Sequence, residues 1–381
     1  MAKRIALLGA TGSIGTQTLE VLEKLKGIID YELVFVACSS RGKELYSRFA
    51  DDEKVTVVSD GASGLKGKAS EVTSTECLNY VETYSDIDLV INGIGGLSGV
   101  EPSVRALEAG CALITANKES LVAFGMNIVR LAKEKKQEII PLDSEHSAIY
   151  QCLLGENKED VTALTLTASG GAFRDFSKER IAEMPARKAL EHPNWKMGKK
   201  VTVDCATLMN KGLELIEARN LFGIDNVKAV IHRESVVHGA ASFRDGSMKI
   251  YASRPDMRIP IAYALTQPKR TDLGFSETIG LDALSGFYYS EPDYERFPCL
   301  KLAEMAMSFK TDRAGAVLTA ADEVAAEAYL DGRLSFYGIS RAVEDALGRF
   351  ASGEEIYDLD SLNRITSEVK EYILRNIGGY N

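Results

Sequence analysis

The feature that most constrains the fold is a glycine-rich turn at the start of the chain, within RIALLGATGSIGTQTLEVL. Ile5–Leu8 predicts a short buried strand, and Ile14–Leu25 has the apolar spacing of an α-helix. Gly9, Gly12 and Gly15 lie between them. Glycines let backbone amides approach a pyrophosphate, and a helix N-terminus adds positive potential. The turn therefore predicts a dinucleotide-binding α/β domain.

The end of the next predicted strand, Tyr31–Ala37, indicates which dinucleotide binds. NAD-binding chains usually place Asp or Glu there for the ribose 2′-hydroxyl, whereas a 2′-phosphate favours hydroxyls and an arginine. The chain has Ser39, Ser40 and Arg41 and no acidic residue at this point. We therefore expect NADP rather than NAD, although Arg41 would also suit a solvated loop.

Strand and helix patterns continue to alternate, with further strands expected at Ile87–Ile91, Ala112–Thr115 and Ile139–Leu142. This alternation predicts a Rossmann-type, doubly wound parallel sheet, which binds ligands at the carboxyl ends of its strands. The polar residues expected at those ends are Asn117, Lys118, Glu119, Asp143 and Glu145.

An acidic pair follows the last of these strands, in the sequence IIPLDSEHSAIY at Ile139–Tyr150. If the strand continues, Asp143 and Glu145 project to the same side. Two adjacent carboxylates repel each other unless a cation lies between them, and a hard divalent metal is a suitable cation. A solvated turn before a helix with acids in its first turn explains the same residues. The residues alone leave both interpretations open.

The region after residue 144 begins with a predicted strand at Val161–Thr167. An irregular span of the size of a catalytic lid, about residues 169–199, carries His192, the only tryptophan (Trp195) and Met197. A tryptophan that anchors a surface loop to the core is an equally good explanation. A short strand is expected next, at Val201–Val203.

The helix expected after this strand carries a polar face. Asn210, Lys211 and Glu214 are three and four residues apart, so their side chains share one side of the helix. Their apolar surroundings suggest a partly buried polar cluster. A surface Lys–Glu pair, which contributes only a few tenths of a kcal/mol, is the alternative.

A strand-rich segment then predicts subunit pairing. We expect strands at Ala229–His232, Val236–His238, Ala240–Phe243 and Met248–Tyr251, with Asp245-Gly246 as a hairpin turn. Short strands with apolar outer faces often pair between subunits, so the segment predicts a homodimer. His232 and His238 are expected to be structural.

The remainder of the chain predicts helices only, at Leu300–Met307, Ala314–Leu330, Ile339–Phe350 and Leu362–Ile373. We find no catalytic clustering there. The expected domains are an NADPH-binding domain at 1–143, an α+β catalytic and dimerisation domain at 144–268, a linker at 269–296 and an all-helical domain at 297–381.

Composition excludes several classes of protein. The formal net charge of −10 over 381 residues argues against nucleic-acid or anionic-membrane partners. The six scattered cysteines form no C-x-x-C pair, which is typical of reduced thiols in a cytosolic protein. No apolar run approaches membrane-spanning length, and the first strand leaves no room for a signal peptide. We expect a cytoplasmic, soluble protein.

Six motifs then carry a resemblance to a known family. LLGATGSIGTQTLEVL, ANKESLV, PLDSEHSAIYQ, TASGGAFR, HPNWKMG and VDCATLMNKGLELIEA resemble, in this order, the 1-deoxy-D-xylulose 5-phosphate reductoisomerases. The later segments PDMRIPIAYAL and AADEVAAEAYL do so too. The resemblance implies a homodimeric oxidoreductase and isomerase that needs NADPH and a divalent metal. Its product would be 2-C-methyl-D-erythritol 4-phosphate, in the non-mevalonate route to isoprenoid precursors.

The resemblance also implies roles for individual residues. The metal ligands would be Asp143, Glu145 and Glu214, and the catalytic group would comprise these three with Lys118 and His192. Substrate contacts would come from Lys118, Ser144, Glu145, Ser169, His192, Trp195, Met197, Cys205, Asn210, Lys211 and Glu214. Cofactor contacts would come from Thr11, Gly12, Ser13, Ile14, Ser39, Ser40, Arg41, Asn117, Glu119 and Gly198.

Two departures from the family pattern stand out. Cys205 occupies the place of a phosphate-binding serine, and a thiol is a weaker hydrogen-bond donor. Ser39, Ser40 and Arg41 differ from the usual glycine-lysine-asparagine form.

The all-oxygen ligand set favours Mg²⁺ or Mn²⁺ over zinc. The alternatives are another NADP-dependent dehydrogenase, for example of the homoserine type, and a non-catalytic NADP-sensing protein.

Overall fold

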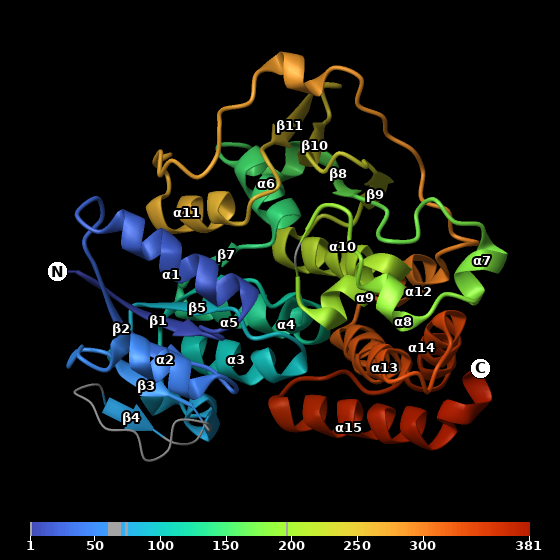
Figure 1. The fold of residues 1–381 in the computed structure, drawn as a ribbon, viewed down its shortest axis with the longest axis horizontal. Helices are drawn as coiled ribbons and strands as arrows, with labels where there is room; N and C mark the ends of the chain where they lie inside the picture. The colour runs from blue at the N-terminus through green and yellow to red at the C-terminus, as the bar shows by residue number, and fades with distance from the viewer. Residues whose placement is uncertain (1, 60–69, 73–74, 196) are drawn as a thin grey trace. The chain divides into compact units, whose positions relative to one another are not determined.

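The chain folds into two compact units (Figure 1). The computed structural model describes residues 2–59, 70–72, 75–195 and 197–381. The first unit comprises residues 1–117, 128–143 and 256–277. The second comprises residues 118–127, 144–255 and 278–381.

A seven-stranded sheet forms the centre of the first unit, in the order β4-β3-β2-β1-β5-β6-β7. Every neighbouring pair is parallel, which confirms the predicted Rossmann-type sheet. The strand order reverses between β1 and β5, where such sheets bind their ligands. The strands are β1 (Lys3–Leu8), β2 (Tyr31–Ala37), β3 (Thr56–Val58), β4 (Ser70–Val72), β5 (Leu89–Asn92), β6 (Ala112–Thr115) and β7 (Ile139–Pro141).

Helices cover this sheet with apolar faces. They are α1 (Ser13–Leu25), α2 (Gly42–Phe49), α3 (Val100–Glu108), most of α5 (Gly125–Lys135) and α11 (Arg258–Thr266). Leu7 and Ile91 of the sheet share one apolar core with Leu22 of α1 and Ile261 of α11. Helix α11 therefore completes the first unit, although the chain has by then passed through all four strands of the second sheet.

The glycine turn after β1 has no room for side chains. Gly9 has a φ of +75°, and a Cβ there would lie 2.6 Å from the carbonyl oxygen of Gly93. A Cβ on Gly15 would lie 2.2 Å from the carbonyl oxygen of Gly9. The turn thus holds β1, the loop after β5 and the start of α1 in close backbone contact. This is the approach that a dinucleotide-binding turn requires.

The second unit contains a four-stranded sheet in the order β11-β10-β8-β9. Strands β8 (Val161–Ala168) and β9 (Val227–Ile231) are parallel, whereas β10 (Val237–Phe243) pairs antiparallel with both β8 and β11 (Met248–Ala252). The prediction of separate strands at Val236–His238 and Ala240–Phe243 was wrong. Gly239 lies within β10 beside a shift in register, so this glycine accommodates a bulge and does not end the strand.

The strand predicted at Val201–Val203 was also wrong, because these residues lie in α9 (Lys199–Thr207). Three residues are too few to separate a strand period from a helix period. Thr202, Val203 and Ala206 are buried, which is the i, i+1, i+4 spacing of a helix face. Burial along that face overrides the β-propensity of valine. Leu208, with a φ of +61°, then turns the chain from α9 into α10 (Met209–Phe222).

Helices make up the rest of the second unit. Its C-terminal part is helical as predicted: α13 packs against α14 and α15, which lie together at the red end of the chain in Figure 1. The helices are α4 (Lys118–Ala123), α6 (Ser144–Leu153), α7 (Lys178–Ala182), α8 (Ala186–Ala189), α9, α10, α12 (Pro298–Ser308), α13 (Asp312–Leu330), α14 (Phe336–Phe350) and α15 (Leu359–Asn376). Among the described residues, no helix is both long enough and apolar enough to cross a membrane.

Candidate active site

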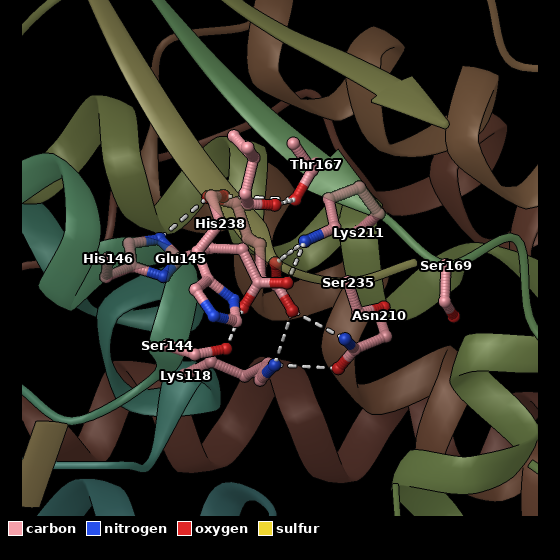
Figure 2. A network of polar contacts seen from close by, with 12 residues as sticks. Lys118, Ser144, Glu145, His146, Thr167, Ser169, Asn210, Lys211, Ser235 and His238 are labelled. Carbon is pink, nitrogen blue, oxygen red and sulfur yellow. Dashed lines mark hydrogen bonds and ion pairs between the residues drawn. The ribbon is translucent and has the colours of Figure 1, made fainter. Parts of the chain in front are cut away.

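A carboxylate buried on α10 is the centre of a polar network. Figure 2 labels its partners Lys118, Asn210 and Lys211. Glu214 is 1% exposed and accepts a hydrogen bond of 2.9 Å from Lys118 Nζ at its Oε1 atom. Lys211 Nζ donates to its Oε2 atom. Asn210 joins the same network, because its Nδ2 atom donates to Glu214 and its Oδ1 atom accepts from Lys118 at 2.7 Å. The three residues with a common helix face therefore form a buried cluster, and not a surface ion pair.

A second carboxylate, Glu145, shares a lysine with Glu214. Lys211 Nζ lies 3.0 Å from Glu145 Oε1, and Ser144 Oγ donates to Glu145 Oε2 at 2.6 Å. The extended-strand geometry expected for Asp143 and Glu145 was wrong. Strand β7 ends at Pro141, and Glu145 lies in the first turn of α6. Proline at the strand end and the favourable helix dipole for an acid explain the early change to helix.

The carboxylates gather closely enough to hold a cation. One oxygen each of Asp143, Glu145 and Glu214 lie within 4.8 Å of one another. Asp143 directly precedes Ser144, the first residue of α6, and is half-buried. Three carboxylates beside two lysines leave one excess negative charge, and carboxylate oxygen is the ligand that Mg²⁺ and Mn²⁺ prefer. These residues therefore fit a hard divalent ion.

Two further residues at this point were not predicted from the sequence. His146 is fully buried, and its Nε2 atom donates to the backbone carbonyl of Glu214 at 3.0 Å. Glu217 lies one turn after Glu214, and its carboxylate is 3.5 Å from the same imidazole. Asp143, His146 and Glu217 form an alternative group with ligand atoms within 4.8 Å. The helical spacing of Glu214 and Glu217 was the available signal in the sequence.

His192 is held as a neutral imidazole by the loop around it. The backbone amides of Asn194 and Trp195 donate to its Nδ1 atom at 3.2 and 3.0 Å. Its ring proton must therefore lie on Nε2, which faces Ser169 Oγ at 3.1 Å. Burial, assisted by the positive charge of Arg174, lowers the pKa of His192 to about 4. At neutral pH the side chain is thus a hydrogen-bond donor without charge.

Other contacts hold the loop that carries His192 and Trp195. Asn194 Nδ2 donates to the carbonyl of Arg233 and to Ser235 Oγ, each at 2.8 Å. The half-buried Trp195 lies near His238, with ring centroids 6.4 Å apart. Asn194 and Ser235 were missed from the sequence, because an amide–hydroxyl pair 41 residues apart leaves no local pattern.

Cys205 links the Ser169 turn with the carboxylate network. A Cβ on Gly171 would lie 2.2 Å from the carbonyl oxygen of Cys205, so the turn after β8 packs directly on α9. Burial raises the pKa of the Cys205 thiol, and Lys118 and Glu214 are close enough to influence it. The thiol therefore stays protonated and is a weak hydrogen-bond donor.

The candidate cofactor residues fall in both units. In the first unit, Thr11 Oγ1 donates to the carbonyl of Ser40 at 3.1 Å and so ties the glycine turn to the end of β2. Gly12, Ser13, Ser39, Ser40 and Arg41 are exposed, Ile14 is half-buried, and Arg41 forms an exposed ion pair with Glu44 at 3.8 Å. Asn117 is buried and donates to the carbonyls of Ile94 and Gly96. In the second unit, Glu119 is buried and Gly198 is the exposed N-cap of α9.

A parallel dinucleotide-binding sheet in one unit and a carboxylate–lysine network in the other define a nucleotide- and metal-dependent type of enzyme. Family models agree with that class. Residues 5–125 match 1-deoxy-D-xylulose 5-phosphate reductoisomerase, residues 139–222 match its C-terminal domain, and residues 252–372 match the DXP reductoisomerase C-terminal domain. The chain belongs to the 1-deoxy-D-xylulose 5-phosphate reductoisomerase family.

Individual relatives are similar over nearly their whole length. The 1-deoxy-D-xylulose 5-phosphate reductoisomerase of Listeria monocytogenes serotype 4b (strain F2365) is 41% identical, over 97% of this chain and 99% of that protein. That of Clostridium botulinum (strain Loch Maree / Type A3) is 37% identical, over 97% and 98%.

Solved structures are similar as well. A DOX-P reductoisomerase in complex with NADPH, fosmidomycin and magnesium has a TM-score of 0.90 at 32% identity, over 98% of both chains. The Zymomonas mobilis enzyme in complex with NADPH has a TM-score of 0.88 at 31% identity, over 99% of both chains.

The lowered pKa of His192 predicts a pH dependence. The folded-state value of about 4 lies below the usual 6.5, so the unfolded chain binds more protons between these values. The contribution of His192 to stability is therefore complete above about pH 6.5 and is lost as the pH falls to about 4. NMR titration of labelled histidines should show one imidazole that remains neutral down to pH 5. The His192→Asn variant assigns the signal, and titration of that signal near pH 6.5 would contradict the geometry.

Proposed function

We propose that the chain catalyses the NADPH- and divalent-metal-dependent rearrangement and reduction of 1-deoxy-D-xylulose 5-phosphate. The product is 2-C-methyl-D-erythritol 4-phosphate, in the non-mevalonate pathway to isoprenoid precursors. The observation that carries the proposal is the buried network around Glu214, in a chain of this family. A homoserine-type dehydrogenase or an NADP-sensing protein is not favoured, because the curated relatives are reductoisomerases along almost the entire chain.

Asp143, Glu145 and Glu214 would hold the metal. Their oxygens lie within 4.8 Å of one another, and the set contains neither His nor Cys. When bound, Mg²⁺ or Mn²⁺ supplies Lewis-acid polarisation of the carbonyl and hydroxyl oxygens of the substrate. Lys118 and Lys211 now balance Glu145 and Glu214. A cation on the carboxylates would make the lysine charges available to an anionic substrate.

The substrate would bind around these lysines. Lys118 would contact the reacting end beside the carboxylates, and Lys211 and Asn210 would contact the phosphate. Ser169 and the neutral His192 offer hydroxyl and imidazole donors for phosphate oxygens. The other proposed contacts are Ser144, Glu145, Trp195, Met197, Cys205 and Glu214. Trp195 and Met197 would exclude water from the reacting atoms.

The first unit would bind NADPH, which supplies the hydride. The crowded glycine turn at Gly9 and Gly15 lets backbone amides reach the pyrophosphate, and no side chain caps α1. The proposed contacts are Thr11, Gly12, Ser13, Ile14, Asn117, Glu119 and Gly198, with Ser39, Ser40 and Arg41 at the 2′-phosphate.

The proposed domains are the NADPH-binding domain at 1–143, the catalytic and dimerisation domain at 144–268, the linker at 269–296 and the helical domain at 297–381.

We also propose a cytoplasmic homodimer. All six cysteines are free thiols, as expected in a reducing compartment. Strand β11 is an edge of the four-stranded sheet, and its outer residues Met248 and Ile250 are 55% and 51% exposed. A long apolar edge is a template for pairing with another strand. A second copy of β11 would cover it and extend the sheet.

The dimer prediction is tested at this edge. The Met248→Lys/Ile250→Lys double variant should change the mass measured by size-exclusion chromatography with light scattering from two chains to one. Leu374→Lys, at a 48% exposed apolar residue of α15, serves as the control and should remain dimeric. A double variant with unchanged mass would place the subunit contact elsewhere.

Two isosteric variants on α10 test the metal site. Glu214→Gln should lower metal-dependent kcat by roughly 100-fold or more, because a Lewis acid supplies several kcal/mol of charge stabilisation. NADPH affinity, measured by fluorescence titration, should not change. Glu217→Gln, one turn away in the alternative ligand group, should retain most of the Mn²⁺ affinity measured by calorimetry. If Glu217→Gln loses the metal and Glu214→Gln keeps it, the ligand assignment is wrong.

A further inference from the structure

A second buried ionic cluster, which the proposed reaction does not use, connects α9 with α13. Lys200 Nζ lies 2.6 Å from Asp204 Oδ2 on its own helix and 2.5 Å from Asp322 Oδ2 on α13. The side chains of Asp204 and Asp322 are 2% and 0% exposed. We propose that Asp322 is a positioning residue that acts through Lys200 to fix the loop carrying His192 and Trp195. The expected effect on catalysis rests on the proposed function, whereas the effect on the position of the loop does not.

One face of α13 holds the chain on both sides of that loop. Asp322 holds Lys200, which follows the loop, and Tyr329 OH donates to the carbonyl of Met184, which precedes it, at 3.2 Å. Asp322 and Tyr329 are seven residues apart, or two helix turns, so they project from the same side of α13. The stretch from Met184 to Lys200 is therefore tethered at each end to a single rigid helix.

The tethered loop reaches the candidate substrate site between these anchors. Asn194 fixes its middle to Arg233 and Ser235, and His192 faces Ser169. Helix α9 then continues to Cys205 and, through Leu208, to α10. A shift of α9 along α13 would move both the His192 loop and the start of α10, so Asp322 acts on the site without touching it.

The charges of the cluster indicate a geometric role. Glu119 also contributes to the field at Lys200, so one ammonium group faces several carboxylates. Burial, together with the neighbouring Asp322, raises the pKa of Asp204 well above its usual value. The Oδ1 atoms of Asp204 and Asp322 are buried without a hydrogen-bond partner. Such an ion cluster contributes little net stability. Its ion pair from α9 to α13 favours the relative position of the two helices in which Lys200 and Asp322 meet.

The two aspartates provide a matched test. Asp322→Asn removes the ion pair between the helices but leaves Lys200 paired with Asp204 on α9. Asp204→Asn removes an equally buried carboxylate but keeps the ion pair to α13. Trp195 is the only tryptophan, so its fluorescence reports directly on the loop. Acrylamide quenching of Trp195 should increase in Asp322→Asn and remain at the wild-type level in Asp204→Asn.

Steady-state kinetics should separate the same variants. Asp322→Asn should raise KM for 1-deoxy-D-xylulose 5-phosphate roughly tenfold with a smaller change in kcat, which indicates weakened substrate binding. Asp204→Asn, which keeps the ion pair to α13, should leave KM near the wild-type value. Tyr329→Phe, which removes the other tether without a change in charge, should shift Trp195 quenching in the same direction as Asp322→Asn.

A cluster that only stabilises the fold would lower the melting temperature of both aspartate variants and leave Trp195 quenching equal in the two, which would overturn the proposal. The quenching measurement needs no turnover. If the wild-type chain does not convert the substrate, the proposed function fails while the quenching difference still tests the positioning role.

Discussion

The structure of the candidate site depends on the ion pairs between one buried carboxylate, Glu214, and two lysines. At 1% exposure, a lone carboxylate would be strongly destabilising, and Lys118 and Lys211 offset this effect. Removing either lysine would leave an uncompensated buried charge. The same two lysines connect α10 with α4 and, through Glu145, with α6. One electrostatic requirement thus brings together three helices that are distant in sequence.

The surrounding fold makes this arrangement rigid. Helix α10 is buried along most of its length and packs against α4, α9 and α12. This packing keeps the helix intact around Glu214 and keeps the carboxylate away from solvent. His146, on α6, donates a hydrogen bond to the backbone carbonyl of Glu214 and so holds the same turn of α10 in place. A site built on packed helices in this way is preorganised, and it can hold like charges close together for an incoming cation.

Local patterns were sufficient to predict much of the fold. The glycine turn, the strands Tyr31–Ala37 and Ala112–Thr115, and the C-terminal helices follow from apolar periodicity and turn residues. The strand predicted at Val201–Val203 was wrong, because burial along a helix face decided the structure of these residues. The shared face of Asn210, Lys211 and Glu214 followed from helical spacing. The partners of that face, Lys118 and Glu145, were expected nearby only through the family resemblance.

Contacts between distant segments explain what the sequence did not reveal. The Lys200–Asp322 ion pair joins residues 122 positions apart, and the Asn194–Ser235 hydrogen bond joins residues 41 apart. Neither produces a periodic or motif-like signal. Both join segments that are distant in sequence, so they become visible only in the folded structure.

The central claim is that this carboxylate–lysine network is a metal-dependent reductoisomerase site. The most direct measurement follows the oxidation of NADPH by its absorbance, with 1-deoxy-D-xylulose 5-phosphate as the substrate. Turnover should stop after treatment with a chelator and return on addition of Mg²⁺ or Mn²⁺. Equal turnover in the chelated and metal-restored enzyme, or no turnover with either metal, would contradict the account.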